Sequence, residues 1–128
     1  MKQIVKLLTL MCRKAHLPAF ALMALLSGLA AHADVVINET TFPDANFRNF
    51  ILSQTYGTDG VLTDAEIAEV TKIDCNYKNI VSLEGIGFFS ALEDLSCYRN
   101  EMTELNLTNN IALKRLSIYN TPLAALDM

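Results

Sequence analysis

Residues 92–102 read LEDLSCYRNEM, and residues 113–123 read LKRLSIYNTPL. Six apolar positions of the segment 92–107 return at a constant offset in the segment 113–128. They are Leu92, Leu95, Cys97, Met102, Leu105 and Leu107, which return as Leu113, Leu116, Ile118, Leu123, Leu126 and Met128. Five of these positions also have an apolar equivalent towards the N-terminus, at an offset that is one residue longer. These equivalents are Val70, Ile73, Cys75, Ile80 and Leu83. The second half of the chain therefore contains two full repeats and most of a third.

The spacing within one repeat follows the pattern L-x-x-L-x-L-x-x-N-x-L, which is typical of the leucine-rich repeat. Leu95 and Cys97 flank a one-residue gap, so they share one face of a short strand and point inward. A single coil is too small to bury its apolar face, and neighbouring coils must complete the core. We expect the side-chain amide of Asn100 to turn inward and bind backbone groups at the bend. Lys78 and Thr121 take its place in the other two coils.

This half of the chain resembles the bacterial leucine-rich-repeat proteins with short coils, found in internalins and in exported repeat proteins of Gram-negative bacteria. Residues 80–86, which read IVSLEGI, resemble the internalin phrase I-x-x-L-x-G-I. The resemblance covers about residues 70–128 by repeat. It implies an α/β solenoid of short coils with a parallel sheet on its concave side, and a protein or glycan as the bound partner.

Residues 34–69 do not repeat. Phe47, Phe50 and Ile51 follow the phrase Phe42-Pro43-Asp44 at helical spacing, which predicts a first helix with one apolar face. Thr63 and Glu66 form a capping box, which predicts a second short helix. The same protein family commonly begins with F-P-D-x-N-F-R and Y-G-x-D-G-x-L-T-x-x-E-I, read here at 42–48 and 56–67. The resemblance implies a small helical cap over the first coil, as terminal repeats require shielding.

The loop between these helices resembles the second half of an EF-hand. If Gly60 is loop position 6, Asp59 and Glu66 stand at positions 5 and 12 of a calcium loop. Thr55 and Gly57 would then occupy positions 1 and 3, and neither offers a carboxylate. We interpret the loop as a degenerate one that holds no metal, with weak binding through Asp59 and Glu66 as the alternative.

Residues 1–33 have the order of a secretory signal peptide. A basic start is followed by the apolar run Leu17–Ala31 and by the small residues Ala31 and Ala33. The run is shorter than the roughly 20 residues that span a bilayer. We therefore predict cleavage after Ala33, no transmembrane span in the mature chain, and export to the periplasm, the cell surface or the medium.

Residues 34–128 are acidic, with six Lys and Arg against fourteen Asp and Glu. This balance argues against nucleic acid and against an anionic membrane surface as partners. Both histidines, His16 and His32, lie in the predicted leader. A mature chain without histidine excludes Ser–His–Asp and Cys–His catalysis and histidine-ligated metals, and we expect no cofactor.

Cys75 and Cys97 occupy the same inward position of adjacent coils. A disulfide or a metal pair is one interpretation, because an exported protein meets an oxidising compartment. Neighbouring strands lie about 4.8 Å apart, however, which is wider than the roughly 3.8 Å between Cβ atoms that a disulfide prefers. We therefore favour two free buried thiols packed as small apolar residues.

The concave side of the sheet carries the candidate partner-binding residues. Tyr98 and Tyr119 fall in one column, and the positions beside this column hold the rest of the set. The full set is Tyr77, Tyr98, Arg99, Tyr119 and Asn120. Tyrosine and arginine are over-represented at binding hot spots. The alternative is a tyrosine ladder that only stabilises the sheet through side-by-side packing.

These observations favour an exported, non-catalytic interaction module that binds a protein or glycan. One alternative is a fragment of a longer repeat protein, whose open C-terminal coil we expect to self-associate or fray. A second alternative is an exported hydrolase that uses paired carboxylates. The candidate pairs are Asp64 and Glu66, Glu93 and Asp94, and Glu101 and Glu104, all of which the repeat or the capping box places at the surface.

Overall fold

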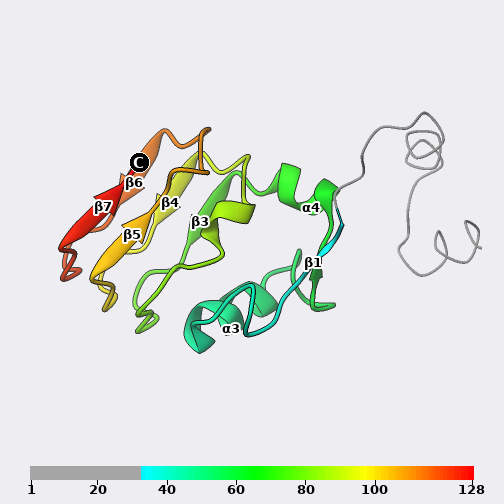
Figure 1. Ribbon diagram of the computed structural model, residues 1–128, viewed down its shortest axis with the longest axis horizontal. Helices are drawn as coiled ribbons and strands as arrows, with labels where there is room; N and C mark the ends of the chain where they lie inside the picture. The colour runs from blue at the N-terminus through cyan, green and yellow to red at the C-terminus, as the bar shows by residue number, and fades with distance from the viewer. Residues whose placement is uncertain (1–32) are drawn as a thin grey trace, which may run out of the picture. The chain divides into compact units, whose positions relative to one another are not determined.

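The computed structural model describes residues 33–128, and the predicted signal peptide lies outside the described residues apart from Ala33 (Figure 1). No helix among the described residues is long and apolar enough to cross a membrane. In chain order the elements are β1 (Val35–Val36), α3 (Ala45–Ser53), β2 (Val61–Leu62), α4 (Asp64–Glu69), β3 (Lys72–Asp74), the 3-10 helix η1 (Ile86–Phe88), β4 (Asp94–Ser96), β5 (Glu104–Asn106), β6 (Arg115–Ser117) and β7 (Ala125–Asp127).

Residues 72–127 form stacked coils that carry two parallel sheets, which gives a solenoid-like fold (Figure 1). The first sheet has the order β3-β4-β6, with Ile73 opposite Leu95 and Leu95 opposite Leu116. These partners are the same residues that the sequence repeat aligns with one another, so the register confirms the alignment of the repeats. The second sheet pairs β5 with β7, with Leu105 opposite Leu126. The spacing predicted the first sheet and did not predict the second.

The core lies between the two sheets and extends under the N-terminal segment. The inward residues of the first two coils are buried, and they are Ile73, Cys75, Ile80, Leu83, Leu92, Leu95, Cys97, Met102, Leu105 and Leu107. Among the equivalent side chains of the third coil, four are only partly buried, namely Leu113, Leu116, Ile118 and Leu123, and Leu126 and Met128 are exposed. Burial of apolar side chains between neighbouring coils is therefore what holds the repeats together.

Asn100 confirms the expected role of an inward asparagine. Its amide nitrogen donates to the carbonyls of Cys75 and Cys97 at 3.0 and 2.9 Å. Its oxygen accepts from the backbone N–H groups of Lys78 and Ile80, both at 3.1 Å. One buried side chain thus satisfies four backbone groups of two coils, which fixes the bend that follows each strand.

The helix α3 begins directly after the segment Phe42-Pro43-Asp44, as the sequence predicted. Asp44 is its N-cap, because one carboxylate oxygen accepts the N–H of Phe47 at 2.8 Å. Phe47 and Ile51 are buried in the core, and Phe50 is partly buried against it. Asn46 extends the contact to the first coil, since its amide donates to the carbonyl of Asn79 at 2.8 Å. The polar and apolar residues of this phrase therefore dock the helix onto the repeats.

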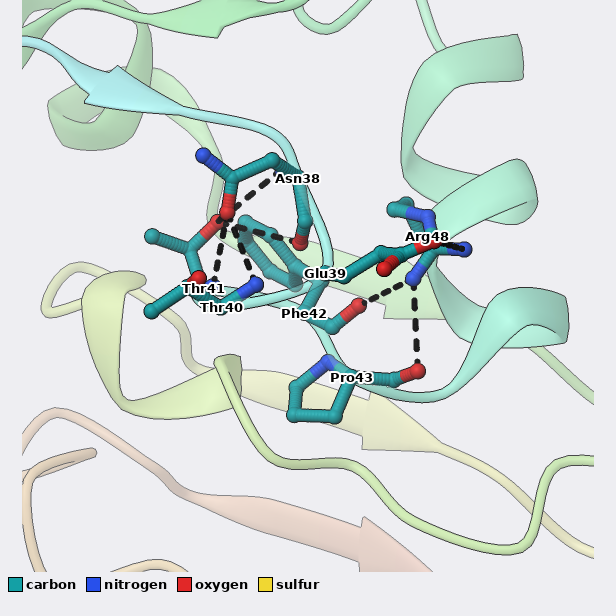
Figure 2. Close-up of polar contacts among 7 residues, drawn as sticks. All are labelled: Asn38, Glu39, Thr40, Thr41, Phe42, Pro43 and Arg48. Atoms are coloured by element: carbon teal, nitrogen blue, oxygen red, sulfur yellow. Dashed lines mark hydrogen bonds and ion pairs between the residues drawn. The ribbon is translucent and has the colours of Figure 1, made fainter.

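The loop before α3 is held by its own polar groups (Figure 2). The side-chain oxygen of Asn38 accepts the N–H groups of Thr40 and Thr41, at 2.8 and 3.1 Å. The guanidinium of Arg48 donates to the carbonyls of Phe42 and Pro43, at 2.8 and 3.2 Å. These bonds hold the ring of Phe42 in place over the first coil.

The surroundings of Gly85 explain why the segment 80–86 has a glycine at this position. Gly85 has a φ of +103°, and a Cβ atom there would overlap the ring of Phe42 and lie 2.6 Å from the carbonyl oxygen of Thr41. Only glycine fits such a close approach at a positive φ. Residues 80–86 are therefore the part of the first coil against which the N-terminal segment packs.

The second helix, α4, begins with the capping box that the sequence predicted. The Glu66 N–H donates to the Thr63 hydroxyl at 3.3 Å, and the Glu66 carboxylate accepts the Thr63 N–H at 2.9 Å. The short strand β1 covers Val35–Val36 and pairs antiparallel with β2. Ile37 still follows the pairing, because its N–H donates to the carbonyl of Gly60 at 2.9 Å.

Candidate partner-binding surface

The five candidate residues gather at the ends of three neighbouring strands. Tyr77 follows β3, Tyr98 and Arg99 follow β4, and Tyr119 and Asn120 follow β6. Because the strands are parallel and in register, these positions form adjacent columns at one edge of the sheet. We call this surface the tyrosine face, defined by Tyr77, Tyr98, Arg99, Tyr119 and Asn120. Tyr77 and Tyr119 are each 58% exposed.

The rings on the tyrosine face contact one another. Tyr98 and Tyr119 stack with centroids 4.3 Å apart and an interplanar angle of 12°. Tyr77 meets Tyr98 edge-on, with centroids 5.3 Å apart and an angle of 79°. The guanidinium carbon of Arg99 lies 5.2 Å from the centroid of the Tyr77 ring, within cation–π range. The expected column of Tyr98 and Tyr119 is thus present, and Tyr77 extends it.

The backbone beneath the tyrosine face turns through the left-handed region at the same place in each coil. Tyr77, Arg99 and Asn120 have φ values of 57°, 54° and 54°. Asparagine tolerates this conformation, whereas bulky residues such as tyrosine and arginine adopt it uncommonly. The turn directs the side chains that follow each strand outward, and two of the three positions carry large side chains in spite of the strain.

Asn76 supports the central ring from the neighbouring coil. Its side-chain oxygen accepts the N–H of Tyr98 at 2.8 Å and the hydroxyl of Ser96 at 2.9 Å. Its amide nitrogen is hydrogen-bonded in turn to Asp74. This chain of bonds joins the first two coils and holds the backbone at Tyr98. Asn76 is not among the five candidate residues that the sequence indicated.

A hydrogen bond with Tyr119, followed by partial burial, raises the pKa of the Tyr98 phenol above its usual value. A phenol is protonated at neutral pH even at its usual pKa of about 10. A protonated phenol both donates and accepts hydrogen bonds. The exposed rim of the tyrosine face can accordingly bind polar groups of either kind.

Cys75 and Cys97 lie in adjacent coils, and both are free and buried. The Cys75 thiol contacts the carbonyl oxygen of Ser96 at 3.6 Å. Burial raises the pKa of both thiols, that of Cys97 to about 12. Neutral, buried thiols are unreactive and pack as small apolar groups.

The EF-hand-like loop uses its carboxylates for its own backbone. Asp59 accepts the N–H of Val61 at 3.1 Å, and Glu66 accepts the N–H and hydroxyl of Thr63 at 2.9 and 2.8 Å. Within residues 33–128, no group of three or more His, Cys, Asp or Glu side chains is arranged to hold a metal ion. Glu66 therefore serves the start of α4.

Three of the carboxylates considered for hydrolysis form ion pairs or hydrogen bonds that support the fold. Glu93 pairs with Lys114 at 3.0 Å, and Asp94 pairs with Arg115 at 3.0 Å, in both cases between neighbouring coils. Glu66 belongs to the capping box, and Glu101 and Glu104 are exposed. Exposed pairs of this kind contribute about 0–1 kcal/mol each to stability.

No protein-family model and no curated protein matches this chain significantly in sequence. Solved structures do match, and the three described here are internalins from Listeria monocytogenes. The functional domain of InlJ, described as including a cysteine ladder, has 26% identity and a TM-score of 0.66, covering 77% of this chain and 22% of its own.

Two further internalins come from strain 4b F2365. InlF has 25% identity and a TM-score of 0.61, covering 73% of this chain and 32% of its own. InlC2 has 22% identity and a TM-score of 0.62, covering 73% of this chain and 43% of its own. The chain thus spans less than half the length of these internalins. The resemblance to internalin leucine-rich repeats that the sequence indicated is confirmed at the level of structure.

Proposed function

We propose that this chain is a non-catalytic interaction module that binds a protein partner through the tyrosine face. The internalin-like repeats support a repeat module of the protein-binding kind. The tyrosine face supports the location, because it presents exposed aromatic rings, a guanidinium and an amide on a continuous sheet. Tyrosine and arginine dominate the energetics of protein interfaces because they bury a large area and keep a polar tip.

The observation that carries this proposal is the left-handed backbone at Tyr77 and Arg99. A glycine or asparagine at these positions would relieve strain, which amounts to about 1–2 kcal/mol per residue for other side chains. The Tyr98–Tyr119 stack stabilises the sheet by itself, but that role does not explain large exposed side chains at the strained positions. Strain held at a surface is the pattern expected of a functional site.

The ring geometry favours a protein over a glycan at this surface. A sugar packs its C–H face on an exposed ring face, but Tyr98 and Tyr119 turn one face of each ring towards the other at 4.3 Å. Tyr98 also contacts the ring of Tyr77, with centroids 5.3 Å apart, so little of its ring face is left for a sugar. Edges and hydroxyls suit the mixed polar and apolar surface of a protein.

We further propose the organisation and location that the sequence suggested. Residues 1–33 direct export to the periplasm, the cell surface or the medium, residues 34–69 act as a helical cap, and residues 70–128 form the repeats. The cap is supported by Phe47 and Ile51, which are buried in the common core, and by the contacts of Asp44 and Asn46 with the first coil.

A site-specific cross-linking experiment tests the proposal. A photoreactive phenylalanine analogue replaces Tyr119 in the full chain produced in host cells, and in a matched control it replaces Val81, which is exposed to 57% and lies off the tyrosine face. We expect one defined protein adduct at position 119 that is absent at 81 and is lost when Arg99→Asn is added. Equal adducts at both positions, or none at 119, would show that the tyrosine face binds no protein.

A further inference from the structure

A second surface lies on the other sheet. An open cleft of about 770 Å³ runs along the outward side of β5 and β7. Its floor carries Glu104, Asn106 and Asp127, and its wall is formed by residues 82–88 with Thr40 and Thr41. This volume lies within the range of about 300–1,000 Å³ that small-molecule sites occupy. None of the five residues of the tyrosine face lines the cleft.

Three side chains hold the wall of the cleft in place through hydrogen bonds to its backbone. Asp44 accepts the N–H groups of Val81 and Ser82, and the Ser82 hydroxyl accepts the N–H of Glu84 at 3.1 Å. Asn38 holds the backbone of Thr40 and Thr41 (Figure 2). A wall that is ordered before a ligand arrives lowers the entropy lost on binding.

The chemistry of the lining excludes an anionic ligand. Glu84, Glu104 and Asp127 line the cleft, and no Lys or Arg is among the lining residues of the described chain. Asn106 uses its side-chain oxygen to accept the N–H of Thr108 at 3.0 Å, which leaves its amide NH₂ as a donor. The cleft therefore offers acceptors and amide donors to a polar ligand.

Phe88 adds an apolar element to this polar surface. Its ring lines the wall, is 38% exposed, and rests on the buried ring of Phe42 with centroids 5.7 Å apart. An aromatic ring beside carboxylate and amide groups fits a ligand that has an apolar face and a rim of hydroxyl groups. We propose that this cleft binds a neutral oligosaccharide, separately from the protein site on the tyrosine face.

The test uses the full chain. The probes are cellotriose, maltotriose and chitotriose, each at about 10 mM, a concentration that fills most of a site whose dissociation constant is about 1 mM. Trigalacturonate and trilysine serve as the anionic and cationic comparisons. Backbone amide chemical shifts report where each probe binds.

We expect at least one neutral trisaccharide to shift the amide signals of residues 82–88 and 104–109. Asn109 and Phe88 both line the cleft. Asn109→Ala and Phe88→Leu should each weaken that binding about tenfold, the equivalent of one lost contact of about 1.4 kcal/mol. Asn49→Ala, an exposed asparagine on α3, is the matched control and should leave binding unchanged. Tyr119→Ala should leave it unchanged too, which separates this site from the proposed protein site.

Three results would overturn the proposal. One is the absence of shifts in the cleft with all three neutral trisaccharides. Another is binding of trilysine alone, which would identify the cleft as a site for a basic peptide segment. Shifts that persist in both cleft variants would place the saccharide elsewhere and count against the cleft equally.

Discussion

The carboxylate of Asp44 joins the start of α3 to the first coil of the repeats. One oxygen accepts the N–H of Phe47 at 2.8 Å, which caps α3, and the other accepts the N–H of Val81 at 2.9 Å in the first coil. The same oxygen also accepts the N–H of Ser82 at 3.2 Å. One side chain thus begins a helix and fastens it to a segment that is distant in the sequence.

Replacing Asp44 should therefore uncouple the N-terminal segment from the coils. Asp44→Ala removes a helix cap worth about 1 kcal/mol and hydrogen bonds to a charged group worth about 1.5–3 kcal/mol. We expect the free energy of unfolding to fall by about 2–4 kcal/mol, measured by urea titration. Glu101→Ala, which removes an exposed carboxylate, is the control. An equally small loss in both variants would contradict the docking role of Asp44.

The asparagine position of each coil gives a paired prediction. Asn100→Leu leaves four backbone groups of two coils without their partner, and each of these groups that is buried costs about 1–3 kcal/mol. We expect this variant to be unfolded or strongly destabilised. Thr121 stands at the same position in the next coil, and its hydroxyl is buried without a partner among residues 33–128.

Thr121→Asn should stabilise the chain. Its amide would face the N–H groups of Asn100 and Met102, which correspond to those of Lys78 and Ile80 that Asn100 binds. A gain of about 1 kcal/mol is expected from a net hydrogen bond, measured as a higher Tm. A Tm that stays the same or falls would show that the third coil does not share the geometry of the second.

The pH dependence of stability follows from the buried thiols. Burial raises the pKa of Cys75 and raises that of Cys97 to about 12, so the folded state keeps both protons at a pH where the unfolded chain loses them. Stability is then complete below the unfolded thiol pKa of about 8.5 and falls as the pH rises towards the folded values.

We expect the free energy of unfolding to be constant from pH 7 to 8 and to fall above pH 9, by up to about 1.4 kcal/mol per pH unit for each thiol. The double variant Cys75→Val, Cys97→Val should flatten this fall, apart from a contribution of Tyr56, whose pKa burial raises to about 12. If the wild-type and double-variant profiles were identical between pH 9 and 10, the thiols would not be the cause.

Calcium should leave the chain unchanged. Asp59 and Glu66 each use one carboxylate oxygen to accept a backbone N–H within the loop, and Thr55 and Gly57 supply no carboxylate to complete a ligand set. A ligand that binds only the native state raises the Tm, and millimolar calcium should cause no such rise. A calcium-dependent increase that Glu66→Gln abolishes would establish a working site in the loop.

Much of the fold could be predicted from spacing alone. The repeated apolar positions determined the register of β3, β4 and β6, and the spacing of Thr63 and Glu66 determined the start of α4. The capping box is a local pattern, and the repeated apolar positions are a periodic one. The pair β5 and β7 was missed because the leucine-rich-repeat pattern assigns one strand to each coil, and each of these is a second strand in its coil.

The candidate site was predictable in composition and only partly in geometry. The column of Tyr98 and Tyr119 followed from the repeat, since equivalent positions stack. The left-handed backbone at Tyr77 and Arg99 could not be anticipated, because such residues rarely adopt it. The double role of Asp44 was hidden as well, since its contact with Val81 depends on how the two segments pack in space.

The central claim is that the tyrosine face binds a protein, and the most direct measurement is the affinity of the partner identified by cross-linking for three chains. The chains are the wild type, Tyr98→Ala and Arg99→Asn. Hot-spot residues contribute about 2 kcal/mol or more, so each variant should bind about 30-fold more weakly or worse. Arg99→Asn should also keep or raise the Tm, because asparagine relieves the left-handed strain. An affinity within twofold of the wild type in both variants would contradict the claim and leave the tyrosines as a stabilising ladder.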